Sequence, residues 1–152
     1  MRLVSLVMLV LLTLTAPTGA TEGLVAKRSP YSVAETMDRL ERAVKDRALI
    51  MVARVDHAAA AQKAGLTLRP TQLLIFGNPK AGTPLMQSAQ SAGIDLPLKV
   101  LAWEDEKGQI WVAYTDPGWL AARHGVTDRA EIVRAITGAL DALTDDVTKV
   151  AR

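Results

Sequence analysis

The stretch LKVLAWEDEKGQIWVAYT (residues 98–115) decides the fold class of this chain. Two apolar runs, 98–103 and 109–115, flank a charged loop that ends in Gly108, a residue able to take a positive φ. This pattern predicts a β-hairpin, and a hairpin cannot belong to a purely parallel sheet. We therefore expect an α+β fold in which helices pack on one face of a mainly antiparallel sheet.

Further strands and helices are expected on both sides of the hairpin. Short apolar runs with β-branched residues predict strands at 23–28, 48–55 and 71–76. Apolar periodicity and cap residues predict helices at 33–46, 57–64, 84–92, in a short segment ending at His124, and in a long segment after Asp128. The expected caps are Ser32, Asp56, Asp128, and Thr83 followed by Pro84.

The first twenty residues have the layout of a secretory signal. A basic start precedes an apolar run from Leu3 to Leu14, Pro17 breaks it, and small residues lead to cleavage after Ala20. A mostly apolar run of twelve residues is too short for a membrane-spanning helix, which needs about 20, so we favour cleavage over a retained anchor. The mature part, 21–152, is then a single exported domain, periplasmic in a Gram-negative bacterium.

Composition excludes several classes of function. The chain has no cysteine, which removes disulfides, thiol catalysis and thiolate metal sites. Its formal net charge is +2, so electrostatics favours neither nucleic acid nor anionic lipid as a partner. No membrane partner is expected once the signal is cleaved. The sequence does not indicate which cofactor, if any, the protein binds.

The segment IFGNPKAGTPL (75–85) agrees only in part with a phosphate-binding loop. Gly77 and Gly82 have the spacing of its two glycines, but Thr83 stands where such a loop needs lysine. Lys80 lies inside the loop instead. We therefore interpret the segment as a strand-to-helix connection that uses Gly, Asn and Pro for their turn chemistry.

Polar residues in two turns form the candidate binding site. Asp56 and His57 follow one apolar strand, and Asn78 and Lys80 follow the next. If the two strands are neighbours and run in the same direction, these four residues cluster at one rim of the sheet. The His57 imidazole beside a carboxylate could then act as a metal ligand or general base, although its place at a helix start also has a purely structural explanation.

Four aromatic residues lie close together in the sequence: Trp103, Trp111, Tyr114 and Trp119. Aromatic side chains on a hairpin often cover the core, and they also form the walls of ligand pockets. Both interpretations remain open, and Tyr114 is therefore included among the candidate ligand-binding residues.

A set of short motifs resembles the bacterial domain-of-unknown-function family numbered 302. The motifs are DHAAAA (56–61), GL (65–66), LRPT (68–71), FGNPKAGTPLM (76–86), IDLPL (94–98), WED (103–105), Tyr114, DP (116–117) and RHG (123–125). The resemblance implies a compact α+β domain with a TATA-binding-protein-like β-α-β4-α layout. The family has no established reaction, so the resemblance implies none for this chain. Some branches carry cysteine near the Asn-Pro and Leu-Pro motifs, where this chain has Gly77 and Leu98.

Three functions remain open on this evidence. The first is an exported, non-catalytic module that binds a small ligand or a metal ion at the His57/Asn78 rim, because function tends to lie in loops on a rigid scaffold. The second is a homodimeric assembly module that pairs through exposed strand edges. The third is a hydrolase or isomerase using His57 with Asp56, which ranks last because no oxyanion site, second base or Ser/His/Asp order is evident.

Overall fold

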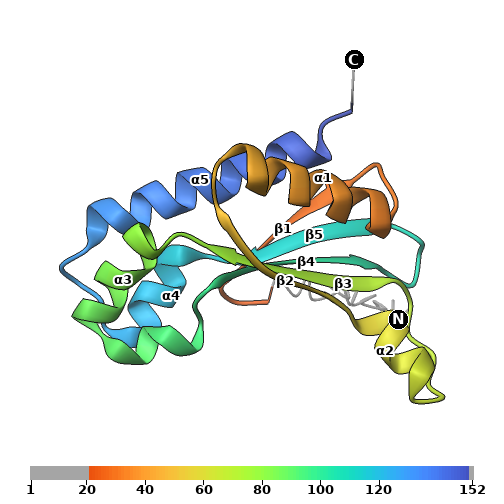
Figure 1. The fold of residues 1–152 in the computed structure, drawn as a ribbon, viewed down its shortest axis with the longest axis horizontal. Coiled ribbons are helices and arrows are strands. Elements are labelled where there is room, and N and C mark those ends of the chain that lie inside the picture. Colours follow the sequence, from red (N-terminus) through yellow and green to blue (C-terminus); the bar gives the residue numbers. More distant parts are fainter. Residues whose placement is uncertain (1–20, 151–152) are drawn as a thin grey trace, which may run out of the picture.

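The computed structural model describes residues 21–150 as a five-stranded sheet covered by helices (Figure 1). The elements are β1 (Leu24–Ser29), α1 (Val33–Asp46), β2 (Ile50–Asp56), α2 (His57–Lys63), β3 (Thr71–Gly77), α3 (Pro79–Ser88), the 3-10 helix η1 (Gln90–Ile94), β4 (Leu98–Glu104), β5 (Ile110–Thr115), α4 (Pro117–His124) and α5 (Ala130–Thr148).

The sheet is antiparallel throughout, with strand order β1-β5-β4-β3-β2. The predicted hairpin is β4–β5, and it places Trp103 opposite Trp111. The predicted α+β class and mainly antiparallel sheet are confirmed. The main elements follow the order β-α-β4-α, and α2, α3, η1 and α4 are insertions in it.

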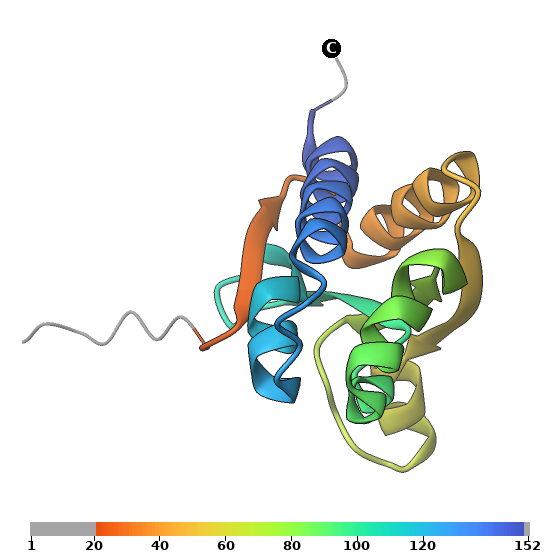
Figure 2. The same ribbon diagram turned by 90° about the vertical axis from the view of Figure 1, so that its left-hand side faces the viewer.

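Helices α1 and α5 lie side by side on one face of the sheet (Figures 1 and 2). Each presents an apolar stripe to the strands, and these stripes hold the most deeply buried side chains. Met37, Leu40 and Val44 of α1 are 0% exposed, and Leu143 of α5 is 1% exposed. Burial of these stripes holds the two helices against the sheet.

Helix α3 begins five residues earlier than the sequence predicted. Its cap is Asn78, whose Oδ1 accepts a hydrogen bond from the Lys80 amide at 2.9 Å, and Pro79 takes the first helical position. Pro84 lies inside the helix, so the expected Thr83 cap is wrong. Both Asn-Pro and Thr-Pro are start signals, and the first acts here because β3 ends directly before it.

The start of α5 also differs from the prediction. The helix begins at Ala130, and no side chain caps it. Asp128 was the expected cap, but its carboxylate accepts hydrogen bonds from Ser88 at 2.5 Å and from Arg129 at 2.6 Å. Asp128 therefore ties the start of the last helix to the end of α3.

The two ends of the described chain lie at opposite ends of β1. The strand starts at Leu24, and Tyr31 follows shortly after its last residue, Ser29. The Tyr31 hydroxyl donates a 2.8 Å hydrogen bond to the carbonyl of Lys149, just past α5. Within residues 21–150, no helix is both long enough and apolar enough to cross a membrane. The predicted signal lies outside the described residues.

Candidate functional site

The two polar turns do not meet at one rim. β2 and β3 are neighbours but run antiparallel, so that Asp56 pairs with Gln72 while Ile50 pairs with Gly77. The two turns are therefore separated by the length of a strand, about 20 Å for six residue steps. Figure 1 shows the result, with α2 and α3 at opposite ends of the molecule. The predicted cluster of Asp56, His57, Asn78 and Lys80 is wrong.

At the α2 end, both oxygens of Asp56 already have local partners. Oδ1 accepts from the Ala59 amide at 2.8 Å, which caps α2, and Oδ2 accepts from Gln72 Nε2 at 3.0 Å. His57 is the first residue of α2 and is exposed. Within residues 21–150, no three His, Cys, Asp or Glu side chains gather as a metal site would require. A metal or a reaction at His57 stays a prediction.

Tyr114 lies in the hydrophobic core. It is 3% exposed and pairs with Val25 of β1 and Val100 of β4. Burial raises the pKa of its hydroxyl above the usual value of 10.0, and the carboxylates of Asp141, Asp116 and Asp145 add to this while Lys27 opposes it. Tyr114 does not line the cleft described next. Its role in ligand binding stays a prediction.

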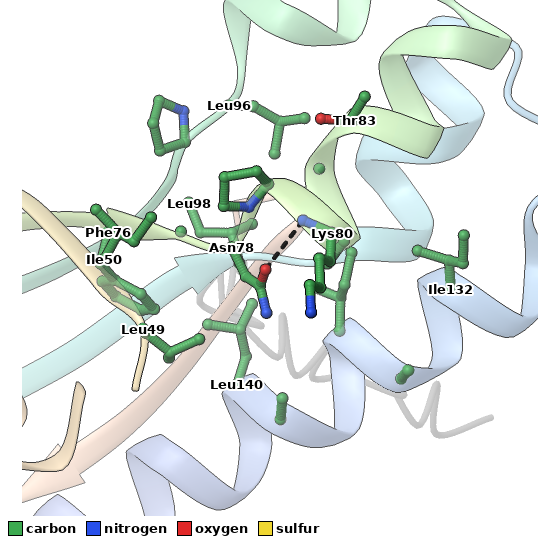
Figure 3. A pocket seen from close by; sticks show the side chains of 18 of the residues that line it. Leu49, Ile50, Phe76, Asn78, Lys80, Thr83, Leu96, Leu98, Ile132 and Leu140 are labelled. Carbon is green, nitrogen blue, oxygen red and sulfur yellow. Dashed lines mark hydrogen bonds between the residues drawn. The ribbon is translucent and has the colours of Figure 1, made fainter. Parts of the chain in front are cut away.

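At the α3 end, a large apolar cleft opens between α3, α5 and the edge of the sheet (Figure 3). Its volume is about 880 Å³. Most of its walls are aliphatic side chains from α5, from β2 and the residue before it, and from β4 and the segment before it. They include Leu49, Ile50, Val52, Leu96, Leu98, Ile132, Ile136, Leu140 and Leu143, with Phe76 of β3 among them.

The polar side chains of the cleft come chiefly from the start of α3. Asn78 uses its oxygen as the cap, which leaves its amide nitrogen free to donate. Figure 3 shows the side-chain nitrogens of Asn78 and Lys80 turned to the same side, toward the cleft. Within residues 21–150, the Lys80 ammonium has no hydrogen-bond or ion-pair partner.

The charge of the cleft walls is entirely positive. Arg47, at the end of α1, is the second basic residue of the lining, and it forms an ion pair with Asp146 and donates to the carbonyl of Ala43 at 3.1 Å. Among residues 21–150, no acidic side chain lines the cleft. The arrangement therefore suits an apolar body with an acidic group near Lys80.

Asn78 and Lys80 were predicted as site residues, but the cleft walls were not. These walls come from five separate helices and strands and from two connecting segments, and each apolar side chain alone has the pattern of an ordinary core residue. Only the packing leaves a space between them. No local sequence signal distinguishes a residue that lines a cleft from one that fills a core.

Comparison with known proteins shows where the chain belongs. The family described as "Domain of unknown function DUF302" matches residues 25–143. A crystal structure described as an uncharacterized conserved protein DUF302 from Bacillus stearothermophilus superimposes with a TM-score of 0.73. It shares 22% sequence identity and covers 83% of this chain and 98% of its own, so it shows the fold.

Two curated relatives are longer proteins. One from Brucella suis biovar 1 (strain 1330) and one from Brucella abortus biovar 1 (strain 9-941), both named "Fluoride-specific ion channel FluC 1", are 47% identical over 131 residues. The match is 85% of this chain but only 50% and 47% of those proteins. The chain spans about half their length, and their name describes the whole proteins. Since the family match covers residues 25–143, the chain itself belongs to the DUF302 family.

Proposed function

We propose that this protein is exported and that its cleft is a non-catalytic binding site for an acidic amphiphile, a medium-chain fatty acid in the simplest case. The aliphatic tail would occupy the cleft between α3 and α5, and the carboxylate would pair with Lys80 and accept from the Asn78 amide. The observation that supports this is that, in the part of the chain that the structure describes, the Lys80 ammonium has no partner and no acidic side chain lines the apolar cleft beside it.

The size of the cleft is consistent with such a ligand. Small-molecule sites span roughly 300–1,000 Å³, and this one has a volume of about 880 Å³. Each buried CH₂ group contributes about 0.8 kcal/mol, so a tail of ten carbons contributes up to about 8 kcal/mol before association costs are subtracted. The carboxylate then fixes the orientation of the ligand.

Laurate and dodecanol are the probes that test the proposal. We expect laurate to bind, and Lys80→Ala to weaken laurate about tenfold, since a hydrogen bond to a charged group contributes about 1.5 kcal/mol. Dodecanol has the same tail without the charge, so its affinity should be unaffected by Lys80→Ala. Calorimetry or displacement of a fluorescent fatty-acid analogue measures both.

Lys107→Ala is the matched control. Lys107 is exposed in the β4–β5 turn and does not line the cleft, so this variant should bind both probes like the wild type. The proposal fails if laurate does not bind. The assignment of Lys80 fails if Lys107→Ala weakens laurate as much as Lys80→Ala does.

A homodimer is the second candidate, because β2 is an edge strand with apolar residues at the surface. Ile50, Met51 and Val52 are 56%, 40% and 57% exposed. Open edges of this kind pair readily with another strand. We expect light scattering to detect a dimer at high concentration and Val52→Lys to dissociate it. A wild-type monomer at every concentration would remove this candidate.

A further inference from the structure

Ser91, His124 and Asp95 form a hydrogen-bonded chain away from the cleft. Ser91 lies on η1, Asp95 follows that helix directly, and His124 is the last residue of α4. The His124 Nδ1 is 3.0 Å from Ser91 Oγ, and Nε2 is 2.7 Å from Asp95 Oδ2. None of the three residues lines the cleft described above.

The carboxylate determines which nitrogen of the neutral ring carries the proton. An ionised Asp95 can only accept, so Nε2 must carry the hydrogen that it donates. Nδ1 is then unprotonated, and its lone pair faces the Ser91 hydroxyl. The ring is therefore held in the tautomer that can accept a proton from this serine.

The hydrogen-bonded side chains run from the partly buried Asp95 and His124 to Ser91 at the surface. The His124 side chain is 7% exposed and that of Asp95 is 23% exposed, whereas Ser91 is an exposed residue. Arg123 lies 3.4 Å from the Asp95 carboxylate, and its guanidinium stands 5.5 Å from the centre of the Trp119 ring. His124 and Arg123 thus both contact the Asp95 carboxylate, and the Ser91 hydroxyl remains accessible to a substrate.

We propose that Ser91 is a nucleophile toward small activated acyl esters, with His124 as its general base and Asp95 as the positioning residue. Ser91 Oγ attacks the carbonyl carbon while its proton moves to Nδ1 of His124. The bond to the leaving alcohol breaks as His124 returns that proton to the leaving oxygen. Water then hydrolyses the acyl-serine by the same route, releasing the acid and restoring the hydroxyl.

The two ring nitrogens exchange roles relative to a serine protease, in which Nε2 faces the serine. Either nitrogen of a neutral imidazole can accept a proton when the other donates to a carboxylate. The surface beside Ser91 includes Ile94, three residues along the same 3-10 helix and 74% exposed. Side chains three apart eclipse in such a helix, so a short acyl group can rest against Ile94.

A fluorophosphonate probe tests the nucleophile, with the modified residue identified by peptide mass spectrometry. We expect labelling at Ser91, and Ser91→Ala should abolish it. His124→Asn should slow it by about 100-fold or more, the lower range for loss of a general base. Hydrolysis of 4-nitrophenyl acetate should fall in parallel in both variants.

Ser88 supplies the matched control. It lies at the end of α3, and its hydroxyl donates to the Asp128 carboxylate at 2.5 Å without a histidine. Ser88→Ala should leave labelling and hydrolysis unchanged. Labelling of Ser88 and Ser91 at equal rates, or no labelling of Ser91, would overturn the proposal.

Nuclear magnetic resonance tests the positioning role of Asp95 separately. This test does not require a His124 variant that folds. The sequence contains only two histidines, so the ¹⁵N resonances of His124 can be compared with those of exposed His57. We expect the Nε2–H tautomer at His124 in the wild type and its loss in Asp95→Asn, together with slower labelling of Ser91. An Nδ1–H tautomer in the wild type would contradict the assigned proton path.

Discussion

Phe76→Ala is expected to lower the free energy of unfolding by about 3–5 kcal/mol, the usual range for removing a buried aromatic ring. Phe76 is 1% exposed on β3, where it pairs with Leu98 of β4. Its ring also lines the cleft, so the space left by the alanine joins an existing opening and the surrounding side chains cannot close it. Urea denaturation followed by circular dichroism measures the loss.

Ile50→Ala is the control for this prediction. Ile50 lines the same cleft but is 56% exposed, so its truncation removes little buried surface and should cost under about 1 kcal/mol. Phe76→Leu should lie between the two, because most of the volume is kept. If Phe76→Ala and Ile50→Ala cost the same, the ring does not support the core as the burial indicates.

Gly23→Ala is expected to cost about 2–5 kcal/mol, and two effects contribute. Gly23 has a φ of +75°, a conformation that costs a residue with a side chain about 1–2 kcal/mol. A Cβ at this position would also lie 2.4 Å from the Trp119 ring, and such overpacking adds about 1–3 kcal/mol. Thermal unfolding and near-ultraviolet circular dichroism of the tryptophans would follow both changes.

Gly65→Ala separates the two effects. Gly65 has nearly the same φ, +73°, but a Cβ there would meet no atom within 4 Å. This variant should therefore show only the backbone cost of about 1–2 kcal/mol. Equal destabilisation by both substitutions would mean that the Trp119 ring moves aside freely. The contact of this ring with Arg123 and the Asp116 cap on the Trp119 amide oppose such a movement.

The fold could be predicted closely because its signals are local. Ser32 caps α1 as expected by accepting from the Glu35 amide at 3.2 Å, and Asp56 caps α2. The charged turn before Gln109 identified the β4–β5 hairpin, which excludes a purely parallel sheet. Where two equivalent signals compete, as Asn78-Pro79 and Thr83-Pro84 do, the residues alone do not decide which one starts the helix.

The site could be predicted only in part, because it depends on how separate elements are placed. Asn78 and Lys80 were recognised from their turn, but grouping them with Asp56 and His57 required two parallel strands, and β2 and β3 are antiparallel. His124 lies 33 residues from Ser91, and the two meet only because α4 packs on η1. No sequence spacing reports such a contact.

The placement of Leu24 and Lys149 relative to β1 has a mechanical consequence. A force that stretches the molecule between Leu24 and Lys149 would pull β1 along its own axis, because Tyr31 holds Lys149 near the far end of that strand. The hydrogen bonds between β1 and β5 lie across that direction, so they would be loaded in shear and would rupture together. A force applied through Leu24 and Lys149 should therefore meet a stiff domain, one that resists extension until the whole strand slides.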